Sequence, residues 1–347
     1  MPKVMVAMSG GVDSSVAAVL LLKQGYDVVG ATLRLYEKDG ISPETERARE
    51  VCEKIGIPHF CFDMRDTFCE KVIKDFATQY DNGFTPNPCI QCNIHLKFGA
   101  LYEKARENGC DYIATGHYCK VGKINGEPAL LRSADRKKDQ TYVLWHLSRE
   151  KLAHILMPLG DITKDEVKKI AEQYSFSSAK AKESQDICFV PEGNYVSFLE
   201  EYNGKKFAKG DYIDINGTVL GKHSGHQCYT VGQRKGLQIA LGVPHYVIEK
   251  CADKNTVTLS ENENMLFKRR VYVKDLSLMD PNFLAQPFRC TAKLRYSAPD
   301  TECTVFPSGN EAVIEFANPV RAPSPGQSAV FYDGERVLGG AIIVKGE

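Results

Sequence analysis

The chain has 347 residues, of which 43% are hydrophobic and 25% are charged, and its 44 lysines and arginines balance 44 aspartates and glutamates. This composition is ordinary for a globular protein of two or three domains, and no uninterrupted apolar run is long enough to span a membrane. Residues 1–3 lead straight into a predicted strand, without a signal or transit peptide, so we expect a cytoplasmic protein with no membrane partner.

The first predicted element is a buried strand over residues 4–8, followed by a glycine turn and an apolar helix over residues 14–24. The turn reads Ser9-Gly10-Gly11-Val12-Asp13-Ser14. Glycines let an anion approach the backbone, and the free N–H groups at the start of a helix attract negative charge. The Walker sequence GxxxxGKS/T is absent, so a different phosphate-binding loop is predicted. A plain glycine turn is the alternative, but it does not explain Ser9, Asp13 and Ser14 together.

Strand and helix signals alternate through the rest of the first half. Further strands are predicted over residues 26–33, 57–62 and 112–115, and further helices over residues 43–55, 66–80, 93–108 and 164–173. Ser42 is a predicted N-cap before Pro43, and Thr163 and Glu166 form a predicted capping box. Strands separated by helices predict a parallel sheet with helices on both faces and ligands beyond the carboxyl ends of the strands. The glycine turn and residues 115–117 lie at such ends.

The pattern changes after about residue 193. From Lys206 onward, short runs of Val, Ile, Thr and Tyr alternate with glycine-containing turns, and long helical periodicity is missing. This predicts two small all-β units that divide near residues 262–268. We therefore expect an α/β catalytic domain over residues 1–195, a central small β domain over 196–265 and a C-terminal, barrel-like β domain over 266–347.

The balanced net charge gives no sign of a nucleic-acid partner, so local clusters of charge have to decide. Basic residues gather over residues 132–138 and 268–270, and Arg289, Lys293 and Arg295 lie close together. Taken alone, each cluster is most simply a solvated surface.

Twelve cysteines in a chain expected to be cytoplasmic argue for reduced thiols rather than a disulfide framework. Cys89 and Cys92 form a Cys-x-x-Cys pair between the proline-rich residues 85–88 and a helix predicted from Asn93, where we expect lowered thiol pKa values. With Cys188 they could bind an iron–sulfur cluster, hold zinc with another ligand, or carry sulfur as a persulfide. Small core residues are the alternative, which we expect for most of Cys52, Cys61, Cys110, Cys228 and Cys251. His223 and His226 are expected to be surface groups.

With these motifs, the whole chain resembles the bacterial tRNA-specific 2-thiouridylases, the MnmA or TrmU family of N-type ATP pyrophosphatases. Besides the SGGxDS loop, the resemblance rests on residues 114–118, 138–142, 158–161, 184–189, 229–236, 295–296, 325–327, 329–333 and 339–340. It implies a first domain like the adenine nucleotide alpha hydrolases. It also implies a reaction in which ATP, with Mg²⁺, adenylates O2 of the wobble uridine of tRNA and sulfur then displaces AMP.

The same resemblance implies three groups of site residues. ATP binding is assigned to Ala7, Met8, Ser9, Gly10, Gly11, Val12, Asp13, Ser14, Leu33 and Gly116, with Asp13 assisting Mg²⁺ and the phosphates. Sulfur transfer is assigned to Cys188, as the persulfide carrier, and to Cys92, which would then form a transient disulfide with it. Contacts with tRNA are assigned to Asn87, Pro88, Cys89, His117, Lys138, Asp139, Gln140, Arg295, Tyr296 and Gln327.

One residue departs from the pattern of the family. Many members have aspartate where this chain has Cys89, NPDxxCN rather than NPCIQCN. Cysteine is a poorer acid or base than aspartate beside a uracil, but here it completes a set of three thiols with Cys92 and Cys188. We therefore hypothesise that these three bind a [4Fe–4S] cluster whose open iron holds sulfide, in competition with the persulfide relay.

The resemblance also implies partners, and other functions compete with it. It implies tRNAs for lysine, glutamate and glutamine, and a sulfur donor that is a cysteine desulfurase or a sulfur-relay protein. An amidating ATP pyrophosphatase ligase is the nearest alternative, but it needs neither the Cys-x-x-Cys pair nor tRNA-binding β units. A zinc-stabilised RNA-binding module is a second alternative, which leaves residues 9–14 unexplained.

Overall fold

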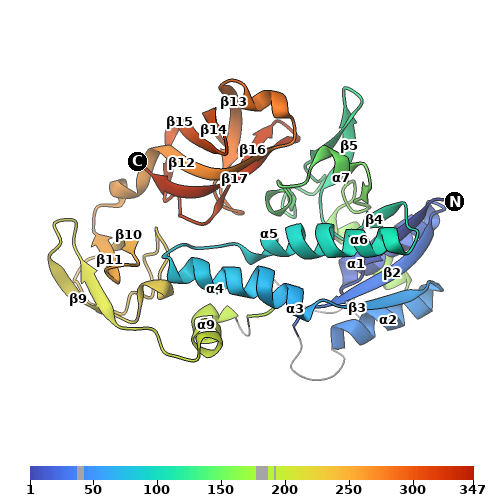
Figure 1. Ribbon diagram of the computed structural model, residues 1–347, viewed down its shortest axis with the longest axis horizontal. Helices are drawn as coiled ribbons and strands as arrows, with labels where there is room; N and C mark the ends of the chain where they lie inside the picture. Colours follow the sequence, from blue (N-terminus) through green and yellow to red (C-terminus); the bar gives the residue numbers. More distant parts are fainter. Residues whose placement is uncertain (37–42, 177–186, 191–192) are drawn as a thin grey trace. The chain divides into compact units, whose positions relative to one another are not determined.

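The computed structural model describes residues 1–36, 43–176, 187–190 and 193–347 (Figure 1). The predicted N-cap Ser42 and residues 184–186 of the family motif lie outside these ranges. The chain divides into two compact units. The first contains Met1–Ile73, Cys89–Gln185 and Asp333–Leu338, and the second contains Lys74–Pro88, Asp186–Tyr332 and Gly339–Glu347.

A five-stranded parallel sheet forms the centre of the first unit, in the order β3-β2-β1-β4-β7. Its strands are β1 (Lys3–Ala7), β2 (Asp27–Arg34), β3 (His59–Asp63), β4 (Tyr112–Ala114) and β7 (Ile155–Leu156). β1 pairs in parallel with both β2 and β4, so the strand order reverses beside it. Open α/β sheets bind ligands at the carboxyl ends of strands at such a reversal.

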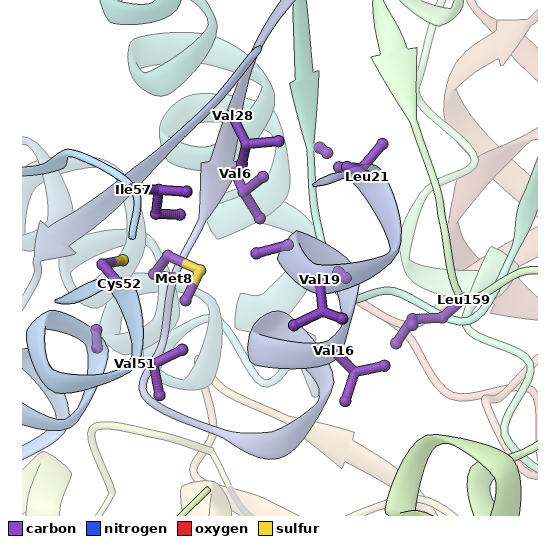
Figure 2. Close-up of a cluster of buried hydrophobic side chains, with 14 of the residues drawn as sticks. Val6, Met8, Val16, Val19, Leu21, Val28, Val51, Cys52, Ile57 and Leu159 are labelled. Carbon is purple, nitrogen blue, oxygen red and sulfur yellow. The ribbon is translucent and has the colours of Figure 1, made fainter. Parts of the chain in front are cut away.

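An apolar core fixes the connection between β1 and the helix that follows it. Helices α1 (Val12–Lys23), α2 (Pro43–Ile55) and α8 (Lys164–Gln173) contribute to one buried cluster with β1. Figure 2 shows Val6 and Met8 among Val16, Val19 and Val51 of the helices. Each fully buried side chain of this kind is worth roughly 1.5–3 kcal/mol. Packing of this core therefore fixes the positions of β1 and α1, and with them the glycine turn that joins these two elements.

The helix that carries the Cys-x-x-Cys pair has three consecutive parts. These are α5 (Pro88–Cys92), the π-helical segment η2 (Asn93–Ala100) and α6 (Leu101–Glu107). The sequence predicted one helix from residue 93, but the helix begins at Pro88, because proline suits the first helical position. Both cysteines therefore lie inside the helix. The helix predicted over 66–80 is likewise divided into α3 (Arg65–Phe68), the π-helical η1 (Cys69–Ile73) and α4 (Lys74–Asp81).

Of two local sequence signals in the first unit, one was predicted correctly and the other was overlooked. The capping box of α8 is confirmed, since Thr163 Oγ1 accepts from Glu166 N at 3.3 Å and the Glu166 carboxylate accepts from Thr163 N at 2.7 Å. A hairpin of β5 (Lys120–Ile124) and β6 (Glu127–Leu131) was not predicted. Its turn residues Asn125 and Gly126 have φ of 53° and 85°, and Asn-Gly is a strong signal for such a turn. Two short helices, η3 (Thr141–Val143) and α7 (Arg149–Leu152), follow this hairpin.

The second unit consists mainly of β structure, preceded by α4 and α9 (Tyr195–Asn203). A four-stranded sheet has the order β10-β11-β8-β9, with β8 (Gly210–Ile213), β9 (Val219–His223), β10 (Tyr246–Cys251) and β11 (Thr256–Ser260). Tyr212, Val247 and Val257 are buried in its core. The short helix η6 (His226–Cys228) connects β9 to the rest of this sheet.

The last part of the second unit is a closed barrel. Its strands are β12 (Phe267–Leu278), β13 (Phe288–Lys293), β14 (Thr301–Ser308), β15 (Glu311–Arg321), β16 (Ser328–Asp333) and β17 (Arg336–Gly346), with short helices η7 (Glu263–Leu266) and η8 (Pro281–Leu284). They follow the order β12-β15-β14-β13-β16-β17, and β12 also pairs with β17, which closes the barrel and removes free edges. The predicted fold class, an α/β domain followed by two all-β units with a barrel last, is confirmed. Across the described ranges, we find no helix with the length and apolar character needed to cross a membrane.

Candidate active site

The predicted phosphate loop joins β1 to α1 in the first unit. Gly10 has φ +71°, and a side chain there would collide with the backbone oxygen of Glu44. Ser14 Oγ accepts a hydrogen bond from Ser9 N at 3.2 Å and donates one to Gly11 O at 3.0 Å. These bonds hold the loop at the N-terminal end of α1, whose free N–H groups attract anions. The loop therefore has the geometry of an anion-binding site.

The other residues assigned to ATP lie around this loop. Ala7 and Leu33 belong to the adjacent parallel strands β1 and β2, and Met8 follows β1 directly. Gly116 follows β4, and a Cβ atom there would lie 2.8 Å from both Ser14 N and the carbonyl carbon of Asp13. Only glycine allows so close an approach. The structure therefore brings the loop and Gly116 together, and ATP binding at this place stays a prediction.

Asp13 lies in the first turn of α1, where a negative charge interacts favourably with the helix dipole. Its Oδ1 accepts hydrogen bonds from Tyr118 Oη and Lys164 Nζ, each at 2.7 Å, and its Oδ2 accepts from Lys164 Nζ at 2.9 Å. Lys164 was not predicted from the sequence, because no local pattern connects positions 13 and 164. The available signal was that α8 begins just after β7, at the carboxyl edge of the same sheet. One carboxylate beside phosphate oxygens is a donor set that suits Mg²⁺.

Cys89 and Cys92 lie one helical turn apart on α5, so their side chains share one face of the helix. Cys89 reaches the surface, whereas Cys92 is buried. Desolvation by the surrounding protein raises the pKa of both thiols, and the positive charge of Lys97 opposes this rise. The predicted lowering of their pKa values is wrong, because loss of solvent disfavours the thiolate more than the nearby charge favours it.

Cys188 belongs to the second unit, where it lies in a turn and is exposed. Three thiols have the soft donor chemistry that an iron–sulfur cluster requires. Within the residues that the structure describes, however, no group of three His, Cys, Asp or Glu side chains is placed to hold a metal ion. Cys89 and Cys92 belong to the first unit and Cys188 to the second, so binding of a cluster by these three thiols stays a prediction.

In the first unit, His117 lies close to the helix that carries Cys89 and Cys92, formed by α5, η2 and α6 and called the cysteine helix below. It is buried, its Nδ1 pairs with Thr115 Oγ1 at 2.6 Å, and its Nε2 is 3.5 Å from Lys97 Nζ. Burial, together with the charges of Lys97 and His146, lowers its pKa well below the ordinary value. His117 is therefore neutral near pH 7, and its contact with tRNA stays a prediction.

The three assigned residues 138–140 have different surroundings. The buried Asp139 carboxylate accepts hydrogen bonds from Ser133 N at 2.7 Å and from Thr141 N at 3.2 Å. Gln140 Oε1 accepts one from Tyr118 N at 2.9 Å. These bonds give Asp139 and Gln140 a part in holding the local chain, and contact with tRNA stays a prediction for all three residues.

The remaining residues assigned to tRNA lie in the second unit, apart from Cys89. Arg295 Nη2 donates to Val231 O at 2.8 Å and to Ala322 O at 2.9 Å, whereas the neighbouring Tyr296 side chain is 43% exposed. Gln327 Nε2 donates to Thr85 O at 2.6 Å. Gln327 therefore holds the segment that leads to Asn87 and Pro88, a role that the sequence did not indicate.

Two expectations about histidines outside the assigned site are wrong. His223 and His226, expected at the surface, are 4% and 5% exposed. Their rings bond to backbone in a compact β unit, since His226 Nε2 pairs with Asp81 O at 3.1 Å and His223 Nδ1 accepts from Gly225 N at 3.0 Å.

The five cysteines expected to be mostly core residues differ in burial. Cys52 and Cys110 are buried, and Cys228 and Cys251 are partly buried. Cys61 is exposed because it lies on β3, an edge strand of the sheet.

Comparison with known proteins gives consistent matches along the chain. Three family models match: the tRNA methyl transferase HUP domain over residues 2–192, the tRNA methyl transferase PRC-barrel domain over residues 196–261 and the Aminomethyltransferase beta-barrel domain over residues 268–343. The tRNA-specific 2-thiouridylase MnmA of Clostridioides difficile is 45% identical to this chain, and that of Carboxydothermus hydrogenoformans is 43% identical. Each match covers 99% of this chain and 98% of the relative.

Among solved structures, the U34-tRNA thiolase NcsA from Methanococcus maripaludis with its [4Fe-4S] cluster is 21% identical at a TM-score of 0.37. That match covers 58% of this chain and 66% of the thiolase, and a likeness this weak supports no conclusion about the present site. The full-length relatives are far more similar. The chain therefore belongs to the family of tRNA-specific 2-thiouridylases, MnmA.

Proposed function

We propose that this protein converts the wobble uridine of tRNA into 2-thiouridine in two steps that use different parts of the chain. ATP first adenylates O2 of the uracil, and sulfur then replaces the adenylated oxygen at C2. The observation that carries this proposal is the preformed loop over residues 9–14, with Asp13 held at the start of α1 and Gly116 packed against it. The loop supports nucleotide chemistry, and family membership indicates the acceptor.

In the first step, uracil O2 attacks the α-phosphorus of ATP, the bond from that phosphorus to the bridging oxygen breaks, and pyrophosphate leaves. This step converts a carbonyl oxygen, which is a poor leaving group, into a good one. N–H groups at the start of α1 would stabilise the negative charge that develops on pyrophosphate. Mg²⁺ held by Asp13 and phosphate oxygens would supply further neutralising charge.

In the second step, the outer sulfur of a persulfide on Cys188 adds to C2, and AMP leaves with the original oxygen. The Cys92 thiolate then attacks the inner sulfur, which frees 2-thiouridine and leaves a disulfide between Cys92 and Cys188. A thiol reductant must return that disulfide to two thiols. Because desolvation raises the pKa of the Cys92 thiol, the nearby charge of Lys97 is needed to favour the thiolate.

The proposal includes the partners. The target uracil must leave the anticodon stack to reach the loop, as in other enzymes that act on a base. Lys138, Arg295 and the exposed Tyr296 are the proposed contacts with tRNA, through phosphates and stacking. The proposed substrates are the tRNAs for lysine, glutamate and glutamine, and the sulfur donor is a cysteine desulfurase or a sulfur-relay protein. A cytoplasmic location follows from these partners.

The test is an anaerobic reaction of the purified protein with unmodified tRNA, ATP, Mg²⁺, a thiol reductant and a sulfur donor, which is either sulfide or a cysteine desulfurase with cysteine, analysed by nucleoside mass spectrometry. Conversion of wobble uridine to 2-thiouridine is expected, and its absence with both sulfide and a desulfurase as donor would favour an amidating ligase instead. Iron-loaded and chelator-treated samples are compared to choose the sulfur route. With a cysteine desulfurase and cysteine as the donor, which supply persulfide-level sulfur, equal conversion in both samples and full activity of iron-free Cys89→Ser support the persulfide relay. Conversion only in the loaded sample, with iron and labile sulfide lost in Cys89→Ser, supports a cluster.

A further inference from the structure

The phosphate loop has no cation of its own. Its six residues carry a single charged side chain, that of Asp13, which is negative. In Walker loops, by contrast, a lysine within the motif reaches the phosphates. A triphosphate carries several negative charges, and an ammonium or guanidinium group commonly binds phosphate in proteins. A cation from elsewhere in the first unit is therefore needed beside the loop.

Lys164 places its ammonium group at this position. The capping box of Thr163 and Glu166 fixes the start of α8, and Lys164 N donates to Asp135 Oδ2 at 3.1 Å. Lys164 Nζ then lies 2.7 and 2.9 Å from the two carboxylate oxygens of Asp13 and 5.6 Å from the centre of the Tyr118 ring. The charge thus lies at the N-terminal end of α1, next to the anion-binding loop.

The exposed fractions of the Lys164 and Asp13 side chains indicate that this ion pair does more than stabilise the fold. The Lys164 side chain is 9% exposed, whereas the Asp13 side chain is 36% exposed. Taking an ammonium out of water is costly, and a buried ion pair gives little net stability compared with apolar packing. A lysine buried at the anion-binding end of a helix is explained better by a charged ligand. An ammonium has three N–H donors, so it can keep one bond to Asp13 and give another to a phosphate oxygen.

We propose that Lys164 is a phosphate-binding residue of the ATP site and supplies the cation that the loop lacks. This inference rests on the proposed function, and it assigns to the same site a residue from outside the glycine loop. In the adenylation step, the ammonium stabilises the negative charge that grows on pyrophosphate as the bond from the α-phosphorus breaks.

The test compares ligand affinities of the full chain, measured by calorimetry with ATP, pyrophosphate and adenosine. In Lys164→Met we expect the Kd values for ATP and pyrophosphate to rise about 100-fold and the Kd for adenosine to stay within about twofold, because only the phosphates lose a charged partner. Lys164→Arg should restore about a tenth of the wild-type ATP affinity, since it keeps the charge but changes its geometry. Lys169→Met, on the exposed face of the same helix, is the matched control and should bind all three ligands normally.

A structural role would change these results. Unchanged ATP affinity in Lys164→Met, or an equal loss of adenosine affinity, overturns the proposal. If Lys164→Met does not fold because Asp13 is left without its cation, the Asp13→Asn/Lys164→Met double variant is compared with Asp13→Asn alone and must bind pyrophosphate still more weakly, with adenosine binding unchanged. Because these measurements need no tRNA, failure of the wild-type chain to release pyrophosphate with tRNA would contradict the proposed function without touching the assignment of Lys164.

Discussion

The phosphate loop and the cysteine helix lie in the same unit, but they differ in how far they are prepared for chemistry. In the loop, Ser9, Asp13 and Ser14 already have hydrogen-bond partners within the first unit. On the helix, desolvation favours the thiol forms of Cys89 and Cys92, and Cys188 belongs to the other unit. The difference is that the proposed ATP site is formed within the first unit, whereas the proposed sulfur transfer uses residues of both units.

The largest effect on ATP affinity is expected from a substitution that fills the space beside Gly116. In Gly116→Ala the new methyl group would lie 2.8 Å from backbone atoms of Asp13 and Ser14, so the loop must shift. We expect ATP affinity to fall about 100-fold, because a displaced loop loses its aligned N–H donors. Gly122→Ala is the control, since its methyl group meets only the flexible end of Leu131. Equal ATP affinity in Gly116→Ala and wild type, measured by calorimetry, would contradict the geometry described for the loop.

The proposed sulfur-transfer step can be perturbed through η2, the π-helical segment that follows Cys92. A Cβ on Gly99 would lie 2.7 Å from Ile94 O, five residues earlier, an approach typical of π-helical winding. Gly99→Ala should therefore rewind η2 and turn Lys97 relative to Cys92. We expect formation of 2-thiouridine to slow about tenfold while pyrophosphate release in the first turnover is kept, because displacing one positioning group slows the step that this group serves. Equal slowing of both products would show that the two steps are not independent.

The smallest expected effect is on stability, through a buried histidine near the cysteine helix. Burial and the charges of Lys151 and His95 lower the pKa of His146 to about 3, and neither ring nitrogen has a hydrogen-bond partner among the described residues. The unfolded chain, with a pKa of about 6.5, takes up the proton first, so the free energy of unfolding should fall as pH drops from about 6.5 towards 3.

Replacing this histidine should remove part of that pH dependence. His146→Phe should lose less stability between pH 7 and pH 5 than wild type, by about 2 kcal/mol. Urea unfolding at several pH values measures the difference. Parallel pH profiles for the two proteins would mean that His146 is not buried in its neutral form.

Whether the sequence predicted a feature depends on how far apart in the chain its interacting residues lie. The parallel sheet, the glycine loop and the Thr163–Glu166 capping box follow from patterns within a few residues, and the structure agrees with them. The bond from Lys164 to Asp13 joins positions 151 residues apart, so only the folded chain brings it into view. The pKa direction of Cys92 was wrong because helix position is local, whereas burial depends on everything packed around the sulfur.

The most direct test of the central claim measures pyrophosphate and 2-thiouridine from the first turnover of the same anaerobic reaction, in wild type and in the Cys92→Ser/Cys188→Ser double variant. Cys228→Ser/Cys251→Ser, in the second unit, is the matched control and should form both products. For the active-site double variant, we expect tRNA-dependent pyrophosphate release in the first turnover within about threefold of wild type and no 2-thiouridine. Loss of pyrophosphate release together with 2-thiouridine, or continued formation of 2-thiouridine, would contradict the division of the reaction between the loop and the thiols.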